Sequence, residues 1–193
     1  MQNRTISSRK RRSRKKHSRS NNILFDIYNN ALFRLVGKYI ISISVFAVLF
    51  IFLDGSLVLQ RFYDLNALLT GRISNIFLSD IVIKSDVVYV GTFGLKIVSE
   101  CTSIAPTAIL ISGIIAFPSN LSQKLTGAVV GIIVLGFLNL IRTSSLLYIG
   151  SIYPSVFETA HILVWQSLMI ATAIFLWLLW WKYLVNNNFS LKL

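Results

Sequence analysis

Three side chains with potential for chemistry stand at the ends of three separate apolar stretches of this chain: Cys101, Arg142 and His161. A thiol can act as a nucleophile, an imidazole can carry the proton of that thiol, and a guanidinium can bind a carboxylate or a developing oxyanion. Gathered at one place, the three groups would form a site for cysteine-dependent acyl transfer. Whether they gather depends on how the apolar stretches are arranged.

The composition is that of a small membrane protein. Of the 193 residues, 54% are hydrophobic and only 13% are charged, which is too apolar for a soluble domain. Four apolar stretches are long enough to cross a hydrocarbon core of about 30 Å as helices, at residues 39–60, 101–123, 125–141 and 159–181. We therefore predict an all-α membrane protein with about four transmembrane helices, in which residues 23–193 form a single polytopic membrane domain.

Positive charge is concentrated near the N-terminus. Eleven of the nineteen Lys and Arg residues lie within residues 1–38, and a single acid accompanies them. Residues 1–22 have no apolar face, so we expect a disordered basic cytoplasmic tail that contacts anionic lipid and not nucleic acid. Positive charge beside the first span keeps that end in the cytoplasm. With four spans, both termini are then cytoplasmic and residues 61–100 lie outside.

This topology brings the three chemical side chains to one face of the cell membrane. Alternating spans put Cys101 at the outer start of the second stretch, Arg142 at the outer end of the third and His161 at the outer start of the fourth. At 1.5 Å per residue, each stands roughly 26 to 32 Å above the inner end of its stretch. The sequence thus predicts a multi-pass membrane protein with an active site at its outer face.

The only sizeable segment expected outside the membrane is residues 62–100. Its first half has apolar residues at helical spacing, which predicts an amphipathic helix on the outer surface. These residues are Leu65, Leu68, Leu69, Ile73, Ile76 and Phe77. The second half is rich in β-branched and aromatic residues and is broken by Ser85-Asp86 and by two glycines, which predicts a small β-hairpin.

Each candidate residue also has a purely structural interpretation. Cys101 at a helix N-terminus would have a lowered thiol pKa, but a lone cysteine in a membrane helix can equally be small apolar filler. Arg142 can bind a substrate or reach the interface, and Asn139, one turn earlier, can hold a substrate carbonyl or the arginine itself. His161 can act as a general base or only form a structural hydrogen bond, and Glu158, three residues earlier, can orient it.

Other classes of site lack their motifs. The chain has no Gly-rich phosphate loop of standard spacing, no paired-cysteine metal motif and no Gly-x-Ser-x-Gly elbow. Its single cysteine leaves no intrachain disulfide. We expect neither a cofactor nor a metal ion.

Three short motifs resemble the exosortase/archaeosortase family of membrane enzymes. They are GLKIVSECTSIAPTAIL at residues 94–110, NLIR at residues 139–142 and FETAHILVWQ at residues 157–166. The family shows a strand-like lead into a cysteine that is followed by Ser or Thr, here Thr102, then Asn-x-x-Arg, then a lone histidine on successive spans. The resemblance implies that Cys101 is the nucleophile, that Arg142 stabilises substrate or oxyanion, and that His161 carries the proton.

The resemblance also implies a function. Such an enzyme is a cysteine protease or transpeptidase that cleaves the C-terminal sorting signal of exported proteins, through a thioacyl-enzyme, and transfers them to a lipid or surface acceptor. The signal consists of a short motif, a hydrophobic helix and a basic tail. Two alternatives remain from the residues themselves: a non-catalytic membrane scaffold or assembly subunit, and an enzyme that processes lipid or polysaccharide with the same three residues.

Overall fold

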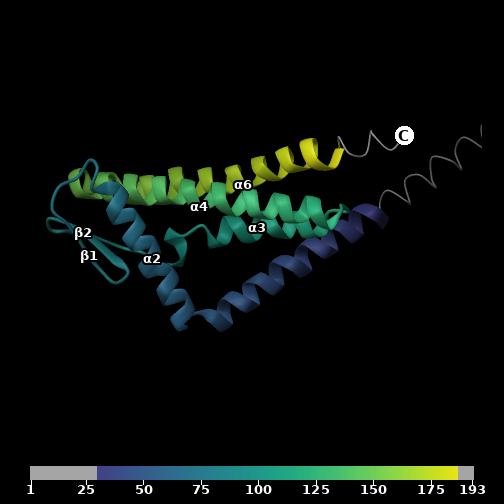
Figure 1. Cartoon of the computed structure of the whole chain (residues 1–193), viewed down its shortest axis with the longest axis horizontal. Coiled ribbons are helices and arrows are strands. Elements are labelled where there is room, and N and C mark those ends of the chain that lie inside the picture. The colour runs from purple at the N-terminus through teal and green to yellow at the C-terminus, as the bar shows by residue number, and fades with distance from the viewer. Residues whose placement is uncertain (1–29, 187–193) are drawn as a thin grey trace, which may run out of the picture.

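The structure, a computed structural model, describes residues 30–186. The expected basic tail at residues 1–22 lies outside the described residues. The chain begins with a helix Asn30–Leu53 and is mostly helical, with one small sheet (Figure 1). The elements that follow are α2 (Leu57–Ser74), β1 (Ile81–Lys84), β2 (Val87–Val90), β3 (Phe93–Lys96), the 3-10 turn η1 (Ser99–Cys101), α3 (Ile104–Ala116) and α4 (Leu121–Ile152). A last helical run contains η2 (Pro154–Val156), α5 (Phe157–Thr159), the π-helix η3 (Ala160–Gln166), α6 (Ser167–Trp180) and η4 (Trp181–Asn186).

Three helices within residues 30–186 are long and apolar enough to cross a membrane: Asn30–Leu53, Leu121–Ile152 and Pro154–Val185. The prediction of four spans is therefore confirmed only in part. The remaining apolar helix, α3, has 13 residues, which at 1.5 Å each cover about 20 Å, short of a hydrocarbon core of about 30 Å.

The first span ends earlier than its apolar run suggests. The helix stops at Leu53, where Gly55 adopts a left-handed φ of 74° and breaks the helical path. Ser56 then caps α2, because its Oγ accepts the Leu59 N–H at 3.3 Å. Residues 57–60, which we expected at the end of the first span, belong to α2 instead.

Helix α4 is much longer than the predicted third span. It continues through Arg142 to Ile152, since the residues after the arginine carry no charge and contain no proline before Pro154. Its 32 residues correspond to about 48 Å, more than a hydrocarbon core needs. Arg142 thus lies inside a continuous helix, ten residues before its end at Ile152.

Helices α3, α4 and α6 pack alongside one another (Figure 1). Small residues permit this close approach, as is common between helices in lipid. A Cβ at Gly131 would collide with Leu110 of α3, and one at Gly127 would collide with Trp180 of α6. The packed core of this bundle consists of Leu110, Ile114, Leu135, Met169, Ala173 and Trp180.

The sheet has three antiparallel strands in the order β1-β2-β3, where the sequence predicted a two-stranded hairpin. The added strand follows Gly91, whose φ of 56° permits a second tight turn. Helix α2 packs against α4 and the sheet through its small and polar face, while its leucines 65, 68 and 69 remain exposed. That buried face comprises Asn66, Ala67, Thr70, Gly71 and Ser74.

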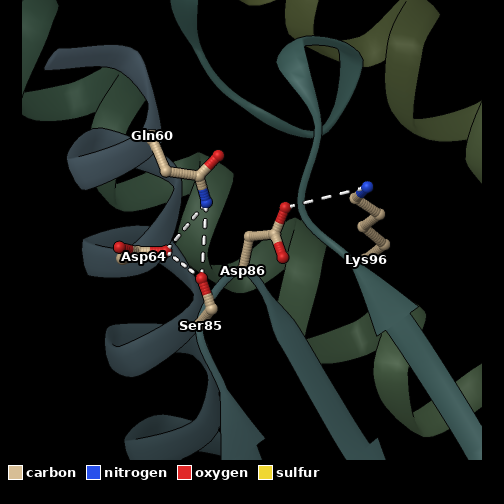
Figure 2. A network of polar contacts seen from close by, with 5 residues as sticks. All are labelled: Gln60, Asp64, Ser85, Asp86 and Lys96. Atoms are coloured by element: carbon tan, nitrogen blue, oxygen red, sulfur yellow. Dashed lines mark hydrogen bonds and ion pairs between the residues drawn. The ribbon is translucent and has the colours of Figure 1, made fainter. Parts of the chain in front are cut away.

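A polar network ties α2 to the turn between β1 and β2 (Figure 2). Asp64 Oδ1 accepts hydrogen bonds from Gln60 Nε2 at 3.1 Å and from Ser85 Oγ at 2.8 Å. The neighbouring residue, Asp86, has its carboxylate Oδ2 3.9 Å from Lys96 Nζ. The main-chain carbonyl of Asp86 accepts a hydrogen bond from the Ile97 N–H at 2.7 Å. These contacts fix the end of β3, and with it the start of η1, which carries Cys101.

Gly150 of α4 offers a test of how the sheet docks on the bundle. A Cβ at this position would collide with the ring of Phe93 in β3, so we expect Gly150→Ala to destabilise the protein by about 1–3 kcal/mol, the usual cost of overpacking. Gly136→Ala, on the same helix, is the matched control because nothing lies within 4 Å of its Cβ. Thermal unfolding of both variants in one detergent measures the difference, and equal melting temperatures would contradict this docking.

Candidate active site

Cys101 is held at the junction between the sheet and α3. It ends η1, and Thr102 after it is extended, with φ −112° and ψ 169°. Thr102 Oγ1 donates to the Ser99 carbonyl at 2.7 Å and accepts the Ile104 N–H at 3.4 Å. Thr102 therefore shapes the chain around Cys101, and its hydroxyl is engaged with the backbone on both sides of the cysteine.

The thiol faces the imidazole of His161. Cys101 Sγ lies 3.8 Å from His161 Nε2, a hydrogen-bonding contact between residues 60 positions apart. The His161 ring stacks on Phe157, with centroids 5.7 Å apart and planes 24° apart. His161 sits on the π-helix η3, a rare conformation that occurs often at functional sites.

Arg142 is a buried cation with unpaired donors. Its side chain is 2% exposed, and neither Nε nor Nη2 has a hydrogen-bond partner among the described residues. One turn earlier on α4, Asn139 Nδ2 donates to the Cys101 carbonyl at 3.1 Å, while Asn139 Oδ1 is buried without a partner. Such orphaned groups are costly unless a water or a ligand satisfies them.

The structure therefore brings Cys101 into contact with both His161 and Asn139, and Arg142 lies on the same turn of α4 as Asn139. It does not show a hydrogen bond between Glu158 and His161. The Glu158 side chain is exposed, and Phe157 is the residue that packs against the imidazole ring.

Two neighbours of the site, Glu100 and Tyr63, were not identified from the sequence. Glu100 is exposed and accepts a hydrogen bond from Ser99 Oγ at 2.7 Å. That bond and a backbone hydrogen bond lower the pKa of the Glu100 carboxyl. Tyr63 of α2 packs against the cluster that contains Cys101. Adjacency to the cysteine could have indicated Glu100, whereas no local pattern marks Tyr63.

The pKa of the Cys101 thiol differs from the sequence-based expectation, which was that a helix N-terminus would lower it. Burial raises the pKa of the thiol, and Glu100 adds to this, against the opposing effects of the Val98 backbone and Arg142. The predicted lowering by a helix N-terminus does not arise because η1 and Thr102 intervene before α3, whose N-cap is Ser103. At neutral pH the thiol is protonated, so attack requires a base, and His161 Nε2 is in place to accept the proton.

This protonation state predicts how the alkylation rate of Cys101 depends on pH. Only the thiolate is alkylated, so the rate with iodoacetamide should rise with pH and reach half of its maximum above the usual thiol pKa of about 8.5. N-acetylcysteine in the same buffer and detergent is the control. A half-maximal rate below that of the free thiol would show a thiolate-stabilising site instead.

Comparison with family models, with curated proteins and with solved structures gave no match to this chain. Within residues 30–186, no group of three or more His, Cys, Asp or Glu side chains is placed to hold a metal ion. The chemistry available at this site is therefore argued from its own side chains: a thiol, an imidazole, a guanidinium and a carboxamide.

Proposed function

We propose that the protein is a membrane cysteine peptidase or transpeptidase that acts on the C-terminal anchor segment of exported proteins, as the resemblance to the exosortase/archaeosortase family implies. The observation that carries the proposal is the 3.8 Å contact between Cys101 Sγ and His161 Nε2. Arg142 supports it, since a buried guanidinium with two unpaired donors is suited to bind an oxyanion or a carboxylate.

The proposed reaction assigns one step to each of these groups. Cys101 Sγ attacks the scissile carbonyl carbon while His161 Nε2 takes the thiol proton. Arg142 donates to the carbonyl oxygen as that oxygen gains negative charge. The C–N bond then breaks, the leaving amine receives the proton from His161, and a thioester remains on Cys101. A second nucleophile, an amine, a hydroxyl or water, attacks the thioester with His161 as base and regenerates the thiol.

The length of α4 supports a site at the membrane edge. Arg142 lies 21 residues after Leu121, the first residue of α4, which corresponds to about 32 Å along the axis, close to the thickness of a hydrocarbon core. In the proposed topology the segment containing α3 also crosses the membrane and both termini are cytoplasmic, so this level is the outer boundary of the cell membrane. The cleavage motif of an anchored substrate, which directly precedes its hydrophobic helix, lies at the same level.

A reporter experiment tests the function. The full chain is co-expressed with exported proteins of the same genome whose C-termini carry a short motif, a hydrophobic helix and a basic tail. We expect a shortened reporter with a new C-terminus, and, after acid quenching, a hydroxylamine-sensitive adduct on Cys101 by mass spectrometry. Full-length reporters beside well-expressed protein would contradict the proposal, and modified lipid without cleaved reporter would favour the lipid-processing alternative.

A further inference from the structure

Asn139 forms a hydrogen bond with the main chain of Cys101 in which the donor and the acceptor are known. Its side chain is 1% exposed, and Nδ2 donates to the Cys101 carbonyl oxygen at 3.1 Å. A carbonyl oxygen can only accept a hydrogen bond, so the amide nitrogen must face Cys101 and Oδ1 must face away. The carboxamide of Asn139 thus has one defined orientation.

The Cys101 carbonyl needs such a partner because of its place in the chain. Cys101 ends η1, and the extended Thr102 takes the backbone out of helical geometry before α3 begins at Ile104. A buried carbonyl outside regular secondary structure must find a donor elsewhere. Asn139 supplies that donor from α4, a helix 38 residues further along the chain.

The turn of α4 that carries Asn139 is itself anchored. Thr143 Oγ1 donates to the Asn139 carbonyl at 3.0 Å and lies 2.7 Å from Thr70 Oγ1 of α2. Both threonines are fully buried. The hydroxyl hydrogen of Thr143 already bonds to a carbonyl of its own helix, α4, so Thr70 must be the donor in the bond to Thr143. This bond joins α2 to the turn of α4 that holds Cys101.

We propose that Asn139 is the positioning residue that holds the Cys101 main chain, so that Sγ stays opposite His161 and at the level of Arg142. The catalytic consequence rests on the proposed function, whereas the anchoring itself does not. A reacting group displaced by about 1 Å can lose about 100-fold in rate, so one hydrogen bond to the main chain of the nucleophile has a large effect on turnover.

The chain offers a matched control for this role. Asn66 of α2 is also a buried asparagine whose Nδ2 donates to a main-chain carbonyl, that of Phe62, at 2.8 Å. Asn139→Leu and Asn66→Leu each remove one such bond and keep the branched shape and the number of side-chain heavy atoms, so the larger volume of leucine affects both variants alike. Only Asn139→Leu releases Cys101, so effects common to both variants report structure alone.

Two measurements on the full chain in detergent test the proposal. In Asn139→Leu we expect kcat to fall by about 10- to 100-fold with KM changed by less than about threefold. Alkylation of Cys101 by iodoacetamide should be at least about fivefold faster, because the thiol, 4% exposed in the structure, is freed to open locally. Asn66→Leu should change neither quantity.

The outcomes separate the two proposals. Unchanged alkylation in Asn139→Leu, or equal changes in both leucine variants, would overturn the positioning role. Reporter cleavage that persists in Cys101→Ala would overturn the proposed function and leave the alkylation result to decide on the anchoring. Cleavage that depends on Cys101 but keeps its kcat in Asn139→Leu would overturn the positioning role alone.

Discussion

We expect Cys101→Ala to abolish reporter cleavage, with a loss of about 10⁴-fold or more, because it removes the nucleophile of a catalytic unit. Cys101→Ser is expected to fail as well, because a serine hydroxyl is far less acidic than a thiol and the proposed base, His161, lies 3.8 Å from the thiol sulfur. The measurement is the ratio of full-length to shortened reporter in cells with equal amounts of the variant in the membrane.

Ser103→Ala is the control for Cys101. Ser103 is the N-cap residue of α3, but its side chain makes no capping hydrogen bond, so this nearby substitution should leave cleavage unchanged. Normal cleavage in Cys101→Ala would rule out cysteine catalysis. In that case the burial of the thiol, in one cluster with Leu146 and Leu147, would identify Cys101 as packing, in agreement with the scaffold alternative.

Arg142→Lys keeps the positive charge, yet we expect it to lose about 10²- to 10³-fold in kcat, comparable to the removal of an oxyanion donor. Lysine presents a single ammonium group, whereas the guanidinium offers planar donors that can bind two oxygens at once. Two of those donors, Nε and Nη2, are buried and unpaired in the structure. Turnover per mole of membrane-inserted protein is the measurement.

Arg72→Lys provides the comparison for Arg142. Arg72 lies exposed in the last turn of α2, where charge alone matters, so the same substitution should leave kcat within about twofold of the wild type. If Arg142 served only to reach the interface, lysine would replace it equally well. Equal turnover of both lysine variants would therefore refute a role for Arg142 in stabilising the reacting carbonyl.

The fold could be predicted in its outline but not in its boundaries. Apolar runs of membrane length are a local property, and three of them became helices long enough to span. Their ends were set by other effects: Gly55 ended the first helix early, and apolar residues after Arg142 extended α4 to Ile152. The third strand was missed because Gly91 was interpreted as a break, whereas its positive φ makes a turn.

The buried face of α2 shows a different limit. Periodicity predicted an amphipathic helix on the outer surface, but it did not indicate which residues pack against the rest of the protein. In the structure Leu65 is 50% exposed while Thr70 is fully buried. In a membrane protein, packing between helices selects small and polar residues that approach closely and form hydrogen bonds, as Thr70 does with Thr143.

The sequence by itself determined that the chain is mostly helical, with apolar helices long enough to span a membrane and a basic N-terminus. It also identified Cys101, Arg142 and His161 as candidates, because residue type and the length of apolar runs are local properties. Only the tertiary structure decided which groups meet. The contacts of Cys101 with Asn139 and His161 join positions 38 and 60 residues apart, and the protonated state of the thiol follows from burial among residues of α2, the sheet and α4. Distances and burial of this kind arise from packing between elements, which no local pattern encodes.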